Sequence, residues 1–109
     1  MARPISVTQT GAGTSRLVPG NYQITPFNAT IVCTVTGTVN YTVQYTVSDT
    51  GSSTYVQASD TNWTNHATLA SQTATAAGTQ GFPVSGFQLV VNSGSGSVTM
   101  TVLQAGTNN

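Results

Sequence analysis

The stretch VNYTVQYTV, residues 39–47, decides the fold class. Val or Tyr occupies each odd position from Val39 to Val47, and Asn, Thr or Gln occupies each even position. Because successive side chains of a strand point to opposite sides of a sheet, this period of two predicts a β-strand with one buried and one solvated face.

The residues just before this stretch indicate a partner strand. Apolar and polar positions alternate over residues 31–35, with Val32 as the exception, and Thr36-Gly37-Thr38 follows. We expect a hairpin closed by a three-residue turn, because that register keeps both apolar faces together. It pairs Val35 with Val39, Cys33 with Tyr41 and Ile31 with Val43.

A second hairpin is expected near the end of the chain. Residues 87–92 and 98–103 alternate in the same way, and Ser93-Gly94-Ser95-Gly96 separates them. A four-residue loop again sets apolar side chains opposite one another. It pairs Val91 with Val98, Leu89 with Met100 and Phe87 with Val102.

Shorter strands are predicted at residues 4–10, 15–18, 54–58 and 63–69, between turn-forming segments. Residues 67–77 are the one stretch that could hold a helical turn, although Thr and Ser weaken it. The pattern predicts an all-β fold, an antiparallel β-sandwich or a jelly-roll-like barrel of about seven to eight strands. Residues 1–12 form an N-terminal arm or an edge strand, and residues 13–109 a single β-sandwich domain.

Charge is nearly absent from the 109-residue chain. Charged residues make up 4 % of it, against about 25 % in an average domain. Two arginines cannot supply a nucleic-acid surface, and no apolar run has the length of a membrane span or a signal peptide, so we expect synthesis in the cytoplasm. A hydroxyl surface of zero net charge gives little repulsion between copies and suits a protein that is packed among neighbours.

The sequence offers few groups for catalysis. His66 and Cys33 could form a base and a nucleophile, but Cys33 falls on the inward face, where a cysteine is usually inert. Asp49 and Asp60 could contribute to a calcium loop, although an Asp bonded to nearby backbone in a turn is commoner. We therefore expect no enzyme, no metal site and no cofactor.

Trp63 has two interpretations. With Tyr55 and Tyr22 it could form an aromatic platform for a sugar. The alternative, which we favour, is that it anchors the core, because a sandwich of this size commonly buries one large aromatic side chain.

Several segments resemble small virion proteins encoded in the structural modules of tailed bacteriophages. The likeness spans nearly the whole chain. The segments that carry it are MARPISVTQTG (residues 1–11), TPFN (25–28), CTVTGTVNYTVQY (33–45), WTNH (63–66), FPVSG (82–86) and VLQAG (102–106).

This resemblance implies a capsid cement or decoration protein that ties neighbouring capsomers together. Its partners would be the major capsid protein or other virion proteins, with copies of itself, and its location the virion. The alternative is a tail- or fibre-associated host-surface or carbohydrate-binding module. We expect capsid contacts from the N-terminal arm, from the loops 48–53 and 93–96, and from the residues Arg3, Ile5, Arg16, Asp49 and Ser95.

Overall fold

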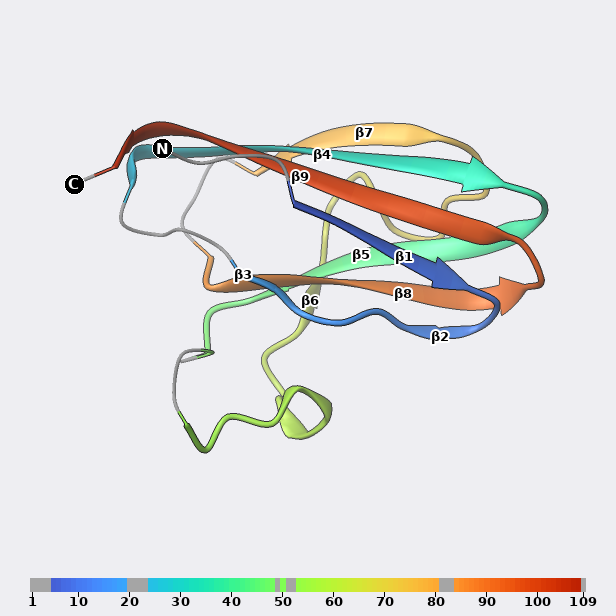
Figure 1. Ribbon diagram of the computed structural model, residues 1–109, viewed down its shortest axis with the longest axis horizontal. Coiled ribbons are helices and arrows are strands. Elements are labelled where there is room, and N and C mark those ends of the chain that lie inside the picture. Colours follow the sequence, from blue (N-terminus) through green and yellow to red (C-terminus); the bar gives the residue numbers. More distant parts are fainter. Residues whose placement is uncertain (1–4, 20–23, 49, 51–52, 81–83, 109) are drawn as a thin grey trace.

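Two antiparallel sheets lie face to face and form two layers (Figure 1). The computed structural model describes residues 5–19, 24–48, 50, 53–80 and 84–108. Within these ranges the helical structure is a single turn of 3-10 helix, η1 (Gln57–Ser59). The all-β sandwich expected from the sequence is confirmed.

Sheet A has four strands and sheet B has five. The order in sheet A is β1 (Ile5–Thr10), β9 (Ser97–Asn108), β4 (Ile24–Thr36) and β7 (Ala76–Gln80). The order in sheet B is β2 (Gly13–Thr14), β8 (Gly86–Gly94), β5 (Val39–Thr46) and β6 (Thr64–Asn65), and β3 (Val18–Pro19) also pairs with β8.

The strand pairings are nested along the chain. β1 pairs with β9, β2 and β3 pair with β8, β4 pairs with β7, and β5 pairs with β6. The contacts of β4 with β9 and of β5 with β8 then join these pairs into the two sheets. A long hairpin folded over in this way is a jelly roll, the more specific of the two expected architectures.

The core fills the space between the sheets with the apolar positions of the alternating strands. The largest fully buried side chains include Tyr41 and Phe87 from sheet B, and Ile31 and Met100 from sheet A. Leu69, from the segment between β6 and β7, is also fully buried. The alternation therefore predicted the inward face of each long strand. It was wrong at Val47, which lies exposed beyond the end of β5, and at Thr42 and Thr46, which are buried although their face was expected to be solvated.

Both predicted hairpins are wrong. β4 and β5 belong to different sheets, as do β8 and β9, so none of the six expected pairs is formed. Strand β4 pairs with β9 instead, which sets Cys33 opposite Met100, and β5 pairs with β8, which sets Val43 opposite Leu89. The alternation of apolar and polar residues indicates which face of a strand is buried, but not which strand lies beside it. A short turn can connect two strands of one sheet or two strands of opposite sheets.

The shorter predicted elements are confirmed in part. Residues 5–10 form β1, an edge strand of sheet A, but only Thr64–Asn65 of the segment 63–69 is a strand. The stretch 54–58 is not a strand; it leads into η1. Residues 67–75 contain no helical turn. They form a series of bends with an isolated bridge between Gln72 and Tyr41, and β7 follows them.

Glycines allow two sheet-crossing turns to touch at one end of the sandwich. Gly37, between β4 and β5, has a φ of 85°, and a Cβ there would lie 3.0 Å from the Cα of Gly96, between β8 and β9. Gly96 N donates to Thr38 O over 3.1 Å, and Gly11 N donates to Gly96 O over 2.9 Å. Three turns are thereby fastened together without side chains between them.

Candidate functional site

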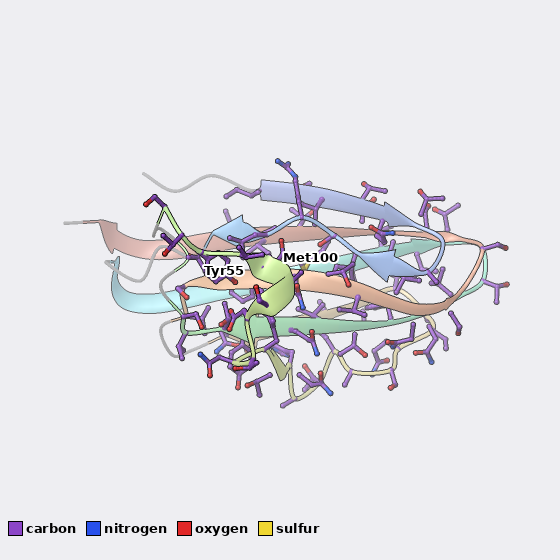
Figure 2. All side chains as sticks on the ribbon, turned by 90° about the horizontal axis from the view of Figure 1, so that it is seen from below. Tyr55 and Met100 are labelled. Atoms are coloured by element: carbon purple, nitrogen blue, oxygen red, sulfur yellow. The ribbon has the colours of Figure 1, made fainter. Side chains whose placement is uncertain are left out.

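The segment between β5 and β6 lies over the outer face of sheet B and is held there by Asp60. In Figure 2 the turn of η1 lies in front of this sheet, with the labelled Tyr55 beside it. Each of the two oxygens of the Asp60 carboxylate accepts two hydrogen bonds. The donors are Thr46 Oγ1 (2.7 Å) and Tyr55 Oη (2.8 Å) to Oδ2, and Ser48 Oγ (2.8 Å) and Asn62 N (2.9 Å) to Oδ1.

These contacts set the ionisation of both partners. Burial alone would raise the pKa of Asp60, but the hydrogen bonds from Asn62, Thr46, Ser48 and Tyr55 together lower this pKa to about 2. Burial raises the pKa of Tyr55 to about 12, with the bond to the Asp60 carboxylate adding to the effect. Asp60 is therefore a fixed negative charge that closes the loop.

This arrangement leaves Asp60 little capacity to bind a metal. Its four acceptor positions are occupied by hydroxyl and backbone donors, which is the turn role that the sequence favoured over calcium. Within the described ranges, no three His, Cys, Asp or Glu side chains gather into a possible metal site. Asp49 lies outside the described residues.

A row of amide side chains crosses the outer face of sheet B. Gln57 Nε2 donates to Gln88 Oε1 (2.7 Å), Gln88 Nε2 to Gln44 Oε1 (2.7 Å), and Gln44 Nε2 to Asn65 Oδ1 (2.8 Å). Gln57 Nε2 also donates to Ser15 O over 3.0 Å. The row ties η1 to β8, β5 and β6, so each amide has a defined orientation.

Trp63 lies at the surface beside this row, and its predicted role as the core anchor is wrong. The side chain is half-buried, and its Nε1 donates to Gln57 O over 3.3 Å. Tyr41 and Phe87 take the central core positions instead. The indole lines an open hollow of about 440 Å³ together with Thr14, Ser15, Gln57, Ala58, Asp60 and Gln88.

The other two groups that could carry chemistry are engaged in the structure. His66 is buried, and its Nε2 contacts Thr79 O at 2.9 Å while its Nδ1 accepts from Thr68 N at 3.2 Å. Cys33 is fully buried and is hydrogen-bonded to Tyr41. The two side chains have different partners, and each serves the packing of its own part of the sandwich.

The outer face of sheet A is uncharged and nearly regular. Hydroxyl pairs join its strands, namely Ser6 with Thr101 and Thr8 with Thr99, each at 2.9 Å. Val32 and Leu103 lie diagonally adjacent on β4 and β9, with 37 % and 45 % of their surfaces exposed. We call the sheet-A face the outward residues Ser6, Thr8, Thr30, Val32, Thr34, Ala77, Thr79, Thr99, Thr101 and Leu103.

The residues expected to touch a capsid are not brought together. Ile5 is half-buried against the core, and the exposed Arg16 reaches Ser6 O over 3.5 Å, so these two lie near the start of β1. Ser95 is exposed in the turn before β9, near the other end of β1, where Thr10 pairs with Ser97. Arg3 and Asp49 lie outside the described residues.

Comparison with known proteins supports the fold alone. No family model matches the chain, and no curated protein matches it. A solved structure described as "Bacillus endospore appendages form a novel family of disulfide-linked pili" is similar, with a TM-score of 0.50 and 15 % sequence identity over 98 % of this chain and 88 % of that one. No helix in the described part of the chain is long and apolar enough to cross a membrane.

Proposed function

We propose that this chain is a non-enzymatic structural protein of a tailed-phage virion, a cement or decoration protein that works by packing against neighbouring subunits. The observation that carries the proposal is the sheet-A face. It presents hydroxyls around an apolar centre of Val32 and Leu103 and includes no charged residue. Association through such a face removes no charge from water.

The occupant that this face fits best is a second copy of the chain. Two identical faces without charge meet without like-charge repulsion, and the hydroxyls of one face can supply both donors and acceptors to its own copy. The exposed side chains of Val32 and Leu103 then become buried, which gives the contact a favourable hydrophobic contribution. The paired copies would attach to the capsid through the predicted contact residues Arg3, Ile5, Arg16, Asp49 and Ser95.

The similar pilus structure is compatible with a role in assembly, because a pilus is built from many subunits. Those pili are described as disulfide-linked. The single cysteine of this chain, Cys33, is 0 % exposed between the sheets, so we propose packing and not disulfide exchange as its means of assembly. The resemblance to phage virion proteins supplies the setting, with the major capsid protein as the larger partner.

The test is an association experiment on the purified protein. Replacing both apolar residues, as Val32→Asp with Leu103→Asp, should weaken self-association by at least about tenfold in sedimentation equilibrium, because each copy would bury unpaired carboxylates. Val47→Asp is the control, since Val47 is 66 % exposed just after β5, away from the sheet-A face, and it should associate as the parent chain does.

Particles test the virion setting. The protein should co-purify with particles of the phage that encodes it, and the double variant should be depleted from them. A parent chain that stays monomeric at high concentration and is absent from purified particles would contradict the proposal.

A further inference from the structure

The hollow beside η1 has an apolar wall of defined orientation. Trp63 Nε1 is used in the bond to Gln57 O, and every other atom of the indole ring is carbon, so the ring offers the hollow an apolar surface. The side chain of Trp63, the one tryptophan of the chain, is partly exposed, which leaves apolar area in contact with water. A ligand that covered this ring would remove that area from water.

Amide groups with fixed orientation stand beside this wall. Both Nε2 hydrogens of Gln57 are used, on Ser15 O and Gln88 Oε1, so the group that Gln57 can still offer is its Oε1 acceptor. Gln88 donates one Nε2 hydrogen to Gln44 and keeps the other. No other hydrogen-bond partner of these two amide groups occurs within the described residues, so an acceptor and a donor remain for a ligand.

The charge of the hollow selects against anions. The lining includes no Lys, Arg or His, and Asp60 is ionised and hydrogen-bonded at both oxygens. A phosphate or carboxylate would therefore meet a negative charge without a compensating cation. A cation would find one aromatic ring and a carboxylate with no acceptor position left, which is less than a cationic site usually provides.

We infer that this hollow binds a neutral saccharide, with one pyranose ring packed on Trp63 and its hydroxyls bonded to Gln57 Oε1 and Gln88 Nε2. A pyranose carries apolar C–H groups on its faces and hydroxyls around its rim, so it matches a wall of carbon beside fixed amides. The volume of about 440 Å³ lies within the usual range of small-molecule sites. The Asp60 and amide networks hold the wall in place beforehand, which lowers the entropic cost of binding.

The inference does not depend on the proposed assembly function, because the hollow lies on sheet B and the sheet-A face on the opposite layer. A saccharide site there would let a particle-bound copy adhere to a glycan-bearing surface.

The experiment titrates the full chain with the methyl glycosides of glucose, galactose and N-acetylglucosamine. Since Trp63 is the single tryptophan, its fluorescence reports on the hollow directly, and saturation-transfer NMR reports binding without it. At least one glycoside should change the Trp63 emission saturably, with a dissociation constant of about millimolar. No saturable change with any of the three up to about 50 mM would overturn the inference.

Variants separate the hollow from unspecific binding. Trp63→Ala should abolish the NMR signal, and Gln57→Met, which keeps the backbone acceptor for Trp63 and removes the amide, should weaken binding by at least about tenfold. Val56→Ala is the control, because Val56 is exposed next to η1 but does not line the hollow. Should Trp63→Ala fail to fold, Trp63→Leu with Gln57→Met decides the matter.

Two results would count against the site. Glycoside binding that survives in Gln57→Met, and in Trp63→Ala or Trp63→Leu, would place the binding site elsewhere. Saturation of Trp63 emission by tetramethylammonium chloride, with none by the glycosides, would make the hollow a cation site and overturn the saccharide assignment.

Discussion

Cys33 and Tyr41 come from opposite sheets, and the thiol of Cys33 is hydrogen-bonded to the phenol of Tyr41 inside the core. The Tyr41 hydroxyl also donates to Ala74 O over 2.8 Å. One phenol therefore links β5 with β4 and with the segment that precedes β7. Burial raises the pKa of Cys33 to about 12, although its hydrogen bond with Tyr41 lowers it in part.

The first prediction is that Cys33 is inert in the folded protein. With a pKa of about 12, only about one thiol in ten thousand is ionised at about pH 8, and the thiolate is the reactive form. A colorimetric disulfide reagent should label no cysteine in native buffer and one in concentrated guanidinium chloride. Rapid labelling of the native chain, or a disulfide dimer on a non-reducing gel, would contradict the structure.

Acid should destabilise the fold through Asp60. Its folded-state pKa of about 2 lies below the ordinary value of 3.8, so its contribution to stability is complete above about pH 4 and is lost as the pH falls towards about 2. Urea midpoints measured across this window should fall for the parent chain. Asp60→Asn should be less stable at neutral pH and nearly flat across the window, whereas Asp49→Asn should keep the parent slope if Asp60 is responsible.

A methyl group at Gly94 should be far more costly than one at Gly11. Both glycines have positive φ values, 105° and 71°, but a Cβ at Gly11 meets open space, while one at Gly94 lies 2.8 Å from the Cα of Val39 and also collides with Thr38 O. Gly11→Ala should lower the free energy of unfolding by about 1 kcal/mol and Gly94→Ala by about 3 kcal/mol or more. Thermal or urea unfolding measures the free energies of both variants. Equal losses would show that Gly94 does not lie against Thr38 and Val39.

Salt should have little effect on self-association. Screening acts between charges, and the sheet-A face includes none. The dissociation constant from sedimentation should change by less than about twofold between about 0.05 and 0.5 M sodium chloride. If the copies dissociate on a modest rise in salt concentration, charged residues such as Arg16 make the contact between them instead.

The sequence predicted the buried face of each long strand but not its neighbours. Alternation over residues 39–47 depends only on which side chains leave water, and that holds whichever strand lies alongside. Thr36-Gly37-Thr38 suits a hairpin turn as well as a crossing between sheets, and in the structure it packs against Gly96, which is distant in sequence. Partner strands in a nested topology are set by such distant contacts, which local patterns do not contain.

The sheet-A face and the hollow beside Trp63 were harder to predict from the sequence than the strands. Val32 broke the alternation of its strand, and the structure shows why: it belongs to the outward face, beside Leu103. Trp63 carried no signal of its exposure, because its position depends on the segment held by Asp60. The amide row was visible only as polar positions such as Gln44 and Gln88, since their contact requires β5 and β8 to be neighbours.

The place of β9 has a consequence for synthesis. This strand lies between β1 and β4, so these two strands have no common neighbour in sheet A until residues 97–108 have left the ribosome. Because most contacts of such a topology join distant parts of the chain, folding should be slow and should wait until β9 has been synthesised. A nascent chain halted before β9 would expose the inner faces of β1 and β4, which makes premature termination a route to aggregation.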